Sequence, residues 1–158
     1  MDQTSRNVGT DLALSRRREL MRVCADATEA ELDGALSAMA PLPMVRDVRP
    51  AATGLVMLRG RIGGDGQAFN VGEASVTRAA VRLDSGETGF SYMLGRSPTK
   101  ARLAAIIDAL GQNTLWHDRL WQALVVPVAA RVAENRATQR AQTEATKVNF
   151  FTLVRGED

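Results

Sequence analysis

The fold is decided by a glycine-punctuated stretch that reads Leu55-Val56-Met57-Leu58-Arg59-Gly60-Arg61-Ile62-Gly63-Gly64-Asp65-Gly66. Alternation along an extended strand places every second side chain on the same face. One face is expected to carry Val56, Leu58 and Ile62, and the other Met57, Arg59 and Arg61. The glycines that follow supply the backbone freedom of a hairpin connection. We therefore predict a β-hairpin with one solvated face. The loop lacks the Gly-Lys-Ser/Thr ending of a phosphate loop, which favours a turn over a nucleotide cradle.

The same pattern extends over residues 45–92, where glycines separate short runs rich in Val, Ile, Leu, Thr and Phe. Such punctuation predicts an antiparallel β-meander. The segment Val76 to Leu83 is ambiguous, because its apolar residues fit both strand alternation and a helical stripe. On either reading Arg78 and Arg82 share a face, with only small side chains between them.

Arginines placed in this way suit several roles. Their planar guanidinium groups bind carboxylates and phosphates in a bidentate manner. Ordinary solvated arginines are the commonest explanation, partner salt bridges come next, and a direct phosphate contact comes last. We take Arg78, Arg82 and Arg96 as candidate contacts to an anion or to a partner.

Two helices are predicted before the meander, and together they would form an N-terminal helical hairpin. Residues 1–10 are expected to be a disordered tail, and a helix over residues 11–27 carries Leu20, Val23 and Cys24 at helical spacing. Thr28 and Glu31 form a capping-box pattern that starts the second helix. Prolines at positions 41 and 43 end it.

Helices also follow the meander. Ser97 as N-cap, Pro98 at the first helical position and Gly111 after the last turn delimit one of them. Thr114 is expected to cap a short helix that is interrupted near Pro127. A long polar helix is then predicted over residues 128–147.

Small residues recur every four positions along that polar helix: Ala129, Ala133, Ala137, Ala141 and Ala145. A ridge of small side chains allows another helix or backbone to approach closely, so Ala133, Ala137 and Ala141 are candidate interface residues. Alanine is also the best helix former, and this alternative is equally acceptable.

The chain ends in a β-type run, Val148-Asn149-Phe150-Phe151-Thr152-Leu153-Val154. Because alternation would place large apolar side chains on both faces, one domain surface would cover only half of them. We therefore predict that residues 148–158 dock on another subunit or on a second copy of the chain. The expected contacts are Phe150, Phe151, Leu153 and Arg155.

Composition narrows the function classes. The chain has 158 residues, 45% of them hydrophobic, which predicts one domain over residues 11–158. No apolar run is long enough for a membrane span and no signal peptide is seen, so a cytoplasmic location is expected. One cysteine and one histidine cannot form a self-contained zinc site. A net charge of +2 is too small to indicate a nucleic-acid-binding protein.

Candidate catalytic groups are scarce. Cys24 lies on an apolar stripe, where a buried inert thiol is the commoner explanation, and His117 has no identifiable partner for general base catalysis. A stand-alone phosphate-ester-binding module and a nucleic-acid-binding module remain the alternatives. The first would show turnover or binding without partners, and the second a steep salt dependence.

Several segments resemble the PhnG family of the bacterial carbon–phosphorus lyase system, in order from about residue 12 to the C-terminus. They are Ala52-Thr53-Gly54-Leu55-Val56, Gly72-Glu73-Ala74-Ser75-Val76-Thr77-Arg78-Ala79-Ala80-Val81-Arg82-Leu83, Tyr92-Met93-Leu94-Gly95-Arg96 and Ala145-Thr146-Lys147-Val148-Asn149-Phe150-Phe151-Thr152-Leu153-Val154-Arg155-Gly156.

The resemblance implies membership of a core complex with PhnH, PhnI and PhnJ, alongside a PhnL-type ATPase. That system couples methylphosphonate to ATP's ribose, a transferase reaction that gives alpha-D-ribose 1-methylphosphonate 5-triphosphate. The resemblance assigns the nucleosidase step to PhnI and the iron–sulfur cluster to PhnJ. It carries no catalytic residue over to this chain. No cofactor or metal is expected in this subunit, and no nucleic acid or membrane partner. The expectation is an α+β assembly subunit.

Overall fold

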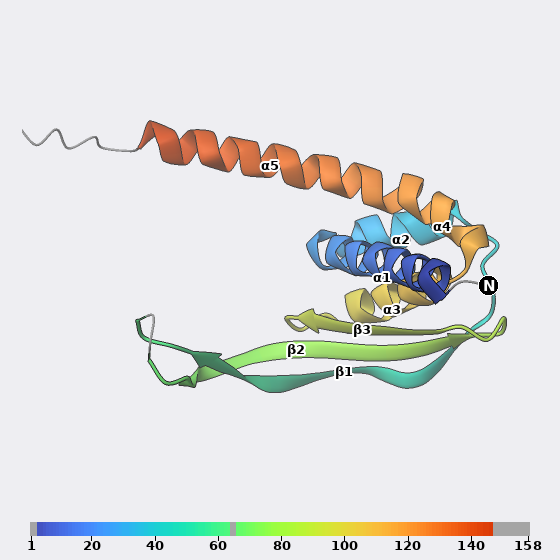
Figure 1. Cartoon of the computed structure of the whole chain (residues 1–158), viewed down its shortest axis with the longest axis horizontal. Coiled ribbons are helices and arrows are strands. Elements are labelled where there is room, and N and C mark those ends of the chain that lie inside the picture. The colour runs from blue at the N-terminus through green and yellow to red at the C-terminus, as the bar shows by residue number, and fades with distance from the viewer. Residues whose placement is uncertain (1–2, 64–65, 147–158) are drawn as a thin grey trace, which may run out of the picture.

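The computed structural model describes the backbone of residues 3–63 and 66–146. Its elements are α1 (Gln3–Asp26), α2 (Glu29–Ala38), β1 (Val45–Gly60), β2 (Phe69–Leu83), β3 (Thr88–Leu94), α3 (Pro98–Leu110), α4 (Thr114–Leu120), the π-helix η1 (Trp121–Val125) and α5 (Val126–Ala145). Figure 1 shows the sheet on one side, helices α1 to α3 above it, and α5 above those helices. The α+β class, the antiparallel meander and the long C-terminal helix are confirmed.

The sheet has the order β1-β2-β3, and both pairings are antiparallel. Strand β3 pairs only with the segment Val76–Arg82 of β2. Strands β1 and β2 remain paired as far as Gly60 and Phe69. They therefore continue beyond β3 as a two-stranded ribbon, which we define as residues 55–60 and 69–75. The ambiguity over Val76 to Leu83 is settled, since this segment lies in β2.

The prediction that one face of the hairpin would be buried is wrong for the ribbon. Leu55, Met57 and Leu58 are 64%, 60% and 46% exposed, and Ile62, 79% exposed, lies beyond the end of β1. The physical reason is visible in Figure 1, where the ribbon projects past helices α1 to α3. Alternation specifies which side chains share a face, but it does not specify whether anything covers that face.

The core is centred on helix α3, which packs against strands β2 and β3 and also against α1 and α2, and buried residues of η1 and α5 complete it. Helix α3 presents small residues, with Ala101, Ala104 and Ala105 fully buried. On the facing strand, a Cβ added at Gly89 would meet the carbonyl oxygen of Ala105 and lie 2.5 Å from the backbone N of Ala109. Glycine at this position allows the helix backbone to approach the strand backbone directly.

Local capping signals place the starts of α2 and α3 correctly. The Thr28 capping box is present, and Ser97 Oγ accepts a hydrogen bond from the backbone N–H of Lys100 at 3.1 Å. One cap is corrected, because Asn113 rather than Thr114 caps α4. Asparagine and threonine are both good N-caps, so the sequence did not separate two adjacent candidates. Gly111 follows α3 as expected, but its φ of −64° is ordinary, and an added Cβ would meet Leu20 Cδ2.

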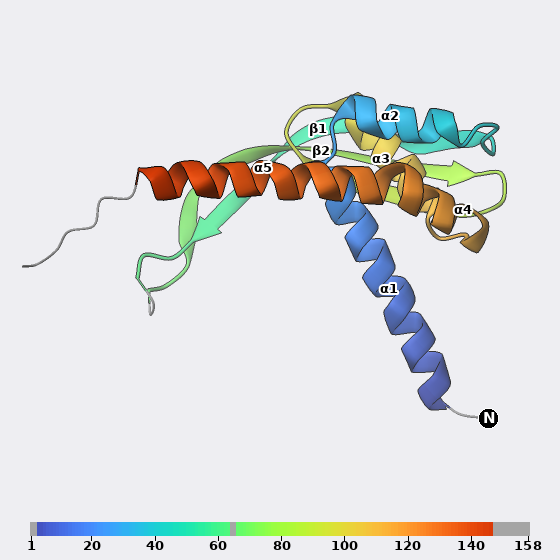
Figure 2. The same ribbon diagram turned by 90° about the horizontal axis from the view of Figure 1, so that it is seen from above.

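Helix α1 begins at Gln3 rather than near Asp11, so residues 3–10, predicted to be a disordered tail, are helical. Buried Leu20, Val23 and Cys24 lie on this helix, as the apolar spacing predicted. Once a helix is nucleated, adding a further residue costs little free energy. No proline interrupts Gln3–Thr10, so the helix can extend over these residues. Figure 2 shows the first half of α1 projecting away from the rest of the molecule.

Candidate subunit interfaces

The candidate catalytic groups of the sequence occupy structural positions. Cys24 is fully buried on α1, and burial raises the pKa of its thiol to about 12, which disfavours the nucleophilic thiolate. The ring of His117 stacks on Trp121 with a centroid separation of 5.6 Å, and its Nδ1 lies 3.3 Å from the carboxylate of Asp118. Within residues 3–63 and 66–146, no three His, Cys, Asp or Glu side chains form a group able to hold a metal ion. No helix of those ranges is long and apolar enough to cross a membrane.

Arg78 and Arg82 lie together on the face of the sheet that points away from the helices. Both are exposed, and they alternate along β2 with Ala79 and Val81, which belong to the core. Arg82 Nε donates to Thr88 Oγ1 at 3.2 Å. The sequence prediction that these two arginines share a face is therefore correct.

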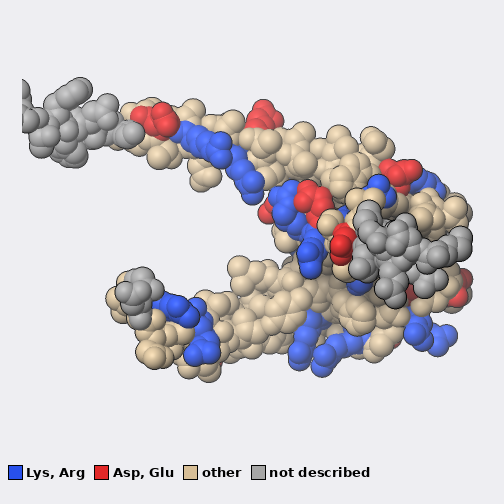
Figure 3. Space-filling model, viewed as in Figure 1, with Lys and Arg blue, Asp and Glu red and all other residues tan. Residues whose placement is uncertain are grey.

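Strand β1 adds two further arginines to this face, and sequence reasoning missed both. In the β1–β2 register Arg46 lies opposite Arg82, and Arg49 lies opposite Ala80. The missing signal was the register between strands, which alternation within one strand does not reveal. We call Arg46, Arg49, Arg78 and Arg82 the arginine face, and Figure 3 shows basic side chains gathered beneath the sheet, opposite the helices.

The arginine face has little acidic compensation. Arg46 and Arg82 line a hollow of about 380 Å³ together with Asp84. None of the ion pairs within 4.0 Å in the described part of the chain includes an arginine of this face. Like charges directly opposite each other on neighbouring strands are unfavourable. A carboxylate or phosphate from outside would relieve that repulsion.

Exposed aromatic and aliphatic side chains adjoin the arginine face. Tyr92 lies opposite Arg78 in the β2–β3 register, and Phe90 lies opposite Ala80. Phe90, Tyr92 and Leu94 are 55%, 60% and 81% exposed. Arginine with tyrosine and phenylalanine is a composition enriched in the centres of protein interfaces.

Arg96 is not part of the arginine face. It is exposed, and its Nε donates to Ser75 Oγ at 3.0 Å. Ser75 is an odd number of residues from Arg78 along β2, so its side chain lies on the opposite face of the strand. Of the three predicted arginine contacts, the structure brings two together and places the third elsewhere.

Ion pairs hold α1 and α5 to the rest of the molecule. Arg17 of α1 makes two hydrogen bonds of 2.7 Å to the buried carboxylate of Asp108 on α3, which also accepts from the backbone N–H of Phe90 at 2.8 Å. This contact raises the pKa of Arg17, chiefly through its hydrogen bonds to Asp108. The first half of α1 beyond this pair leaves Leu12 and Leu14 exposed.

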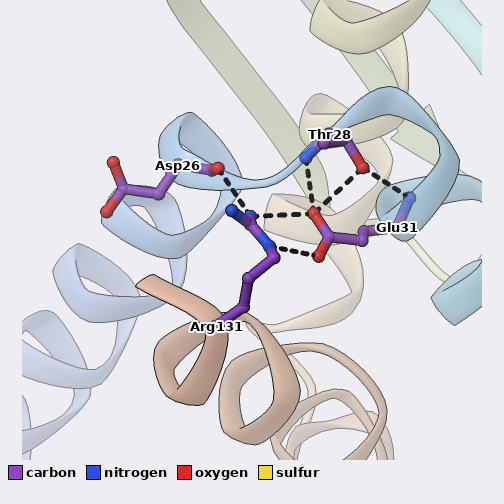
Figure 4. A network of polar contacts seen from close by, with 4 residues as sticks. All are labelled: Asp26, Thr28, Glu31 and Arg131. Carbon is purple, nitrogen blue, oxygen red and sulfur yellow. Dashed lines mark hydrogen bonds and ion pairs between the residues drawn. The ribbon is translucent and has the colours of Figure 1, made fainter. Parts of the chain in front are cut away.

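The pair at the base of α5 is part of a larger network (Figure 4). Arg131 Nε and Nη2 donate to the two carboxylate oxygens of Glu31 at 2.7 and 2.9 Å, and Nη2 also donates to the carbonyl of Asp26 at 3.0 Å. The same carboxylate accepts from the backbone N–H of Thr28 at 2.7 Å. The hydrogen bonds from Arg131, followed by that from Thr28, lower the pKa of Glu31 to about 2.

Beyond Val132 every described residue of α5 is exposed, including Ala133, Ala137 and Ala141. Arg131 and Val132 contact the core side, so Ala133, two positions from Arg131, projects to the opposite side of the helix. The alanine ridge is therefore open to solvent. The predicted contacts Phe150, Phe151, Leu153 and Arg155 lie outside the described residues.

A family model and a relative both match this chain over most of its length. The family model described as "Phosphonate metabolism protein PhnG" matches residues 15–156. A relative from Rhizobium meliloti (strain 1021), named alpha-D-ribose 1-methylphosphonate 5-triphosphate synthase subunit PhnG, is 49% identical over 148 residues. The alignment covers 94% of this chain and 94% of the relative.

Proposed function

Because the chain belongs to the PhnG family of phosphonate metabolism proteins, we propose that it is a non-catalytic assembly subunit of a carbon–phosphorus lyase core complex. In this role it is required for making alpha-D-ribose 1-methylphosphonate 5-triphosphate from ATP and methylphosphonate, as a subunit of a transferase. The single observation that carries the proposal is the 49% identity to a synthase subunit over nearly the full length of both chains.

The partners proposed on this basis are PhnH, PhnI and PhnJ, with a PhnL-type ATPase in the same pathway and a second copy of this chain inside the complex. The chemistry belongs to the partners, and this subunit contributes no cofactor. The proposed location is the cytoplasm. The buried Cys24 supports a non-catalytic role, because its raised thiol pKa disfavours the nucleophilic thiolate.

The arginine face supports an assembly role through its charge and its neighbours. Four exposed arginines without ion pairs in the described chain lie beside exposed Phe90 and Tyr92. We propose that Arg78 and Arg82 contact carboxylates of a partner subunit. Arg96 lies on the other side of β2 and would serve a separate contact.

Helix α5 supplies a second proposed contact surface. Its exposed Ala133, Ala137 and Ala141 would allow a partner helix or backbone to approach closely. The C-terminal residues Phe150, Phe151, Leu153 and Arg155 are proposed to dock as an extended segment on another subunit.

Co-expression of the full chain with the other core subunits, followed by mass measurement of the purified complex, tests the proposal. Replacing both Arg78 and Arg82 by alanine should weaken recovery of the complex or its synthase activity by about 10-fold, since two charge-assisted contacts are lost. The isolated variant should keep its melting temperature, because both side chains are exposed.

Alanine at both Arg16 and Arg18, which are exposed on α1, is the matched control. Unchanged assembly and activity in the Arg78 and Arg82 variant would show that both residues are ordinary solvated arginines without a partner contact. Turnover of ATP or phosphonate by the purified chain alone would contradict the non-catalytic assignment.

A further inference from the structure

The outer edge of β1 consists of two unlike halves. Register shifts interrupt its first half between Asp47 and Arg49 and again between Arg49 and Ala52, and this half also contains Pro50. Bulges, proline and charge are the means by which natural sheets protect an exposed edge from pairing. Residues 52–58 have none of these and pair with β2 in uninterrupted register from Ala52 to Leu58. We call residues 52–58 the free edge.

The opposite edge of the sheet is used by the chain itself. On β3 the backbone N–H of Phe90 donates to Asp108 Oδ2 at 2.8 Å, and the carbonyl of Thr88 accepts from Gln112 Nε2 at 2.9 Å. Among the residues that the structure describes, the backbone of the free edge pairs with β2 alone. Alternate N–H and C=O groups of this edge are therefore directed to solvent.

The free edge is apolar on both faces. Leu55 and Met57 lie on one face, and Val56 and Leu58 lie on the other. Three of the four are at least 46% exposed. A two-stranded ribbon is marginally stable in water unless a further strand or a helix covers it.

A helix and a strand could each cover the ribbon, but they differ in whether they pair the backbone groups of the free edge. A helix laid across the ribbon would cover one face and leave the backbone groups of the edge unpaired. A strand added to the edge satisfies those groups and places side chains on both faces. The apolar pattern of the free edge fits the added strand.

We propose that the free edge accepts an extended strand from a different polypeptide chain, apolar on both faces and with an acidic side chain beside Arg59 and Arg61. A second copy is disfavoured, because residues 48–61 carry Arg49, Arg59 and Arg61 and no acidic residue. Pairing this edge with itself would bring together strands of the same charge. The inference rests on the proposed assembly function and names the geometry of one contact within it.

Hydrogen–deuterium exchange of the full chain, alone and in the complex co-expressed with the other core subunits, tests the inference. In the complex, alternate amides of residues 52–58 should exchange up to about 100-fold more slowly than in the free chain. The exchange rates of residues 45–50 should be unchanged. Leu55→Lys should weaken assembly by about 10-fold to 100-fold, since a buried apolar contact is replaced by a charge. Leu115→Lys is the matched control, because Leu115 is 79% exposed on α4.

Each other outcome overturns a different statement. If the wild-type chain does not co-purify with any other core subunit, the proposed assembly function is wrong and the free-edge inference is wrong with it. If the complex forms and amides 52–58 exchange as in the free chain, the inference alone fails, as it does if Leu55→Lys assembles normally. If the chain forms dimers by itself that protect residues 52–58, a second copy occupies the edge and the different-chain assignment is wrong.

Discussion

Helices α3 and α5 are both rich in alanine, yet they meet opposite surroundings. In α3 eight residues are buried, including Ala101, Ala104, Ala105 and Ala109, whereas in α5 only Val128 is buried. Ala105 and Ala109 of α3 are matched by Gly89 on the facing strand, whereas Ala133, Ala137 and Ala141 of α5 are exposed in the described part of the chain. The comparison teaches that a small-residue stripe permits close approach but does not show whether another element makes it.

The largest effect is expected from Gly89→Ala, which would remove the close approach of α3. The added Cβ would meet the backbone of Ala105 and Ala109, so helix and strand must separate. We expect destabilisation by about 3 kcal/mol, measured by urea denaturation. Gly72→Ala is the control, because nothing lies within 4 Å of its added Cβ, and it should change stability by less than about 0.5 kcal/mol. Equal effects of the two variants would contradict the close-packing role.

An intermediate and pH-dependent effect is expected from Glu31→Gln, which weakens the network that holds α5 to α2. The folded pKa of Glu31 is lowered from 4.5 to about 2, so its carboxylate contributes stability fully above pH 4.5. That contribution is lost as the pH falls through the window from 4.5 to about 2. Because Glu31 is near the surface, the variant should melt at most about 4 °C lower at pH 7.

Thermal melts of wild type and Glu31→Gln from pH 7 down to pH 2 check this expectation. The difference between them should shrink over that window. Glu134→Gln on exposed α5 provides the control and should show no comparable change. A difference that grew toward acid pH would contradict the assigned direction of the pKa shift.

The smallest effect on the isolated chain is expected from replacing Ala133, Ala137 and Ala141 together by leucine. Since all three are exposed, the free energy of unfolding should change by less than about 0.5 kcal/mol per site. Recovery of the complex should nevertheless fall, because the added side chains block close approach. Ala104→Leu in α3 is the contrast and should destabilise by about 1 to 3 kcal/mol. Normal assembly of the triple variant would leave helix propensity as the explanation of the ridge.

The sequence specified those features that depend on neighbouring residues. The capping box at Thr28, the N-cap at Ser97 and the apolar spacing of α1 were all read correctly, because their partners lie within a few positions. The arginine face was read only in part. Arg46 and Arg49 join it through the register between strands, which no local pattern encodes.

The exposure of the ribbon could not be predicted from the local sequence either. Alternation in Leu55–Ile62 looked like a half-buried strand, and only the positions of distant helices show that both faces are open. The start of α1 was missed for a different reason, because a helix that is already nucleated can extend over residues that carry no apolar spacing.

The π-helical turn η1 sets the rotational phase of α5. The backbone N–H of Val126 bonds to the carbonyl of Trp121, five residues earlier, just before Pro127, which has no N–H to donate. One residue more or less in this turn would rotate everything after it by about 100° about the helix axis. Arg131 would then turn away from Glu31, and the alanine ridge would face a different direction. A single-residue insertion or deletion here would thus re-aim a whole surface while leaving its composition untouched.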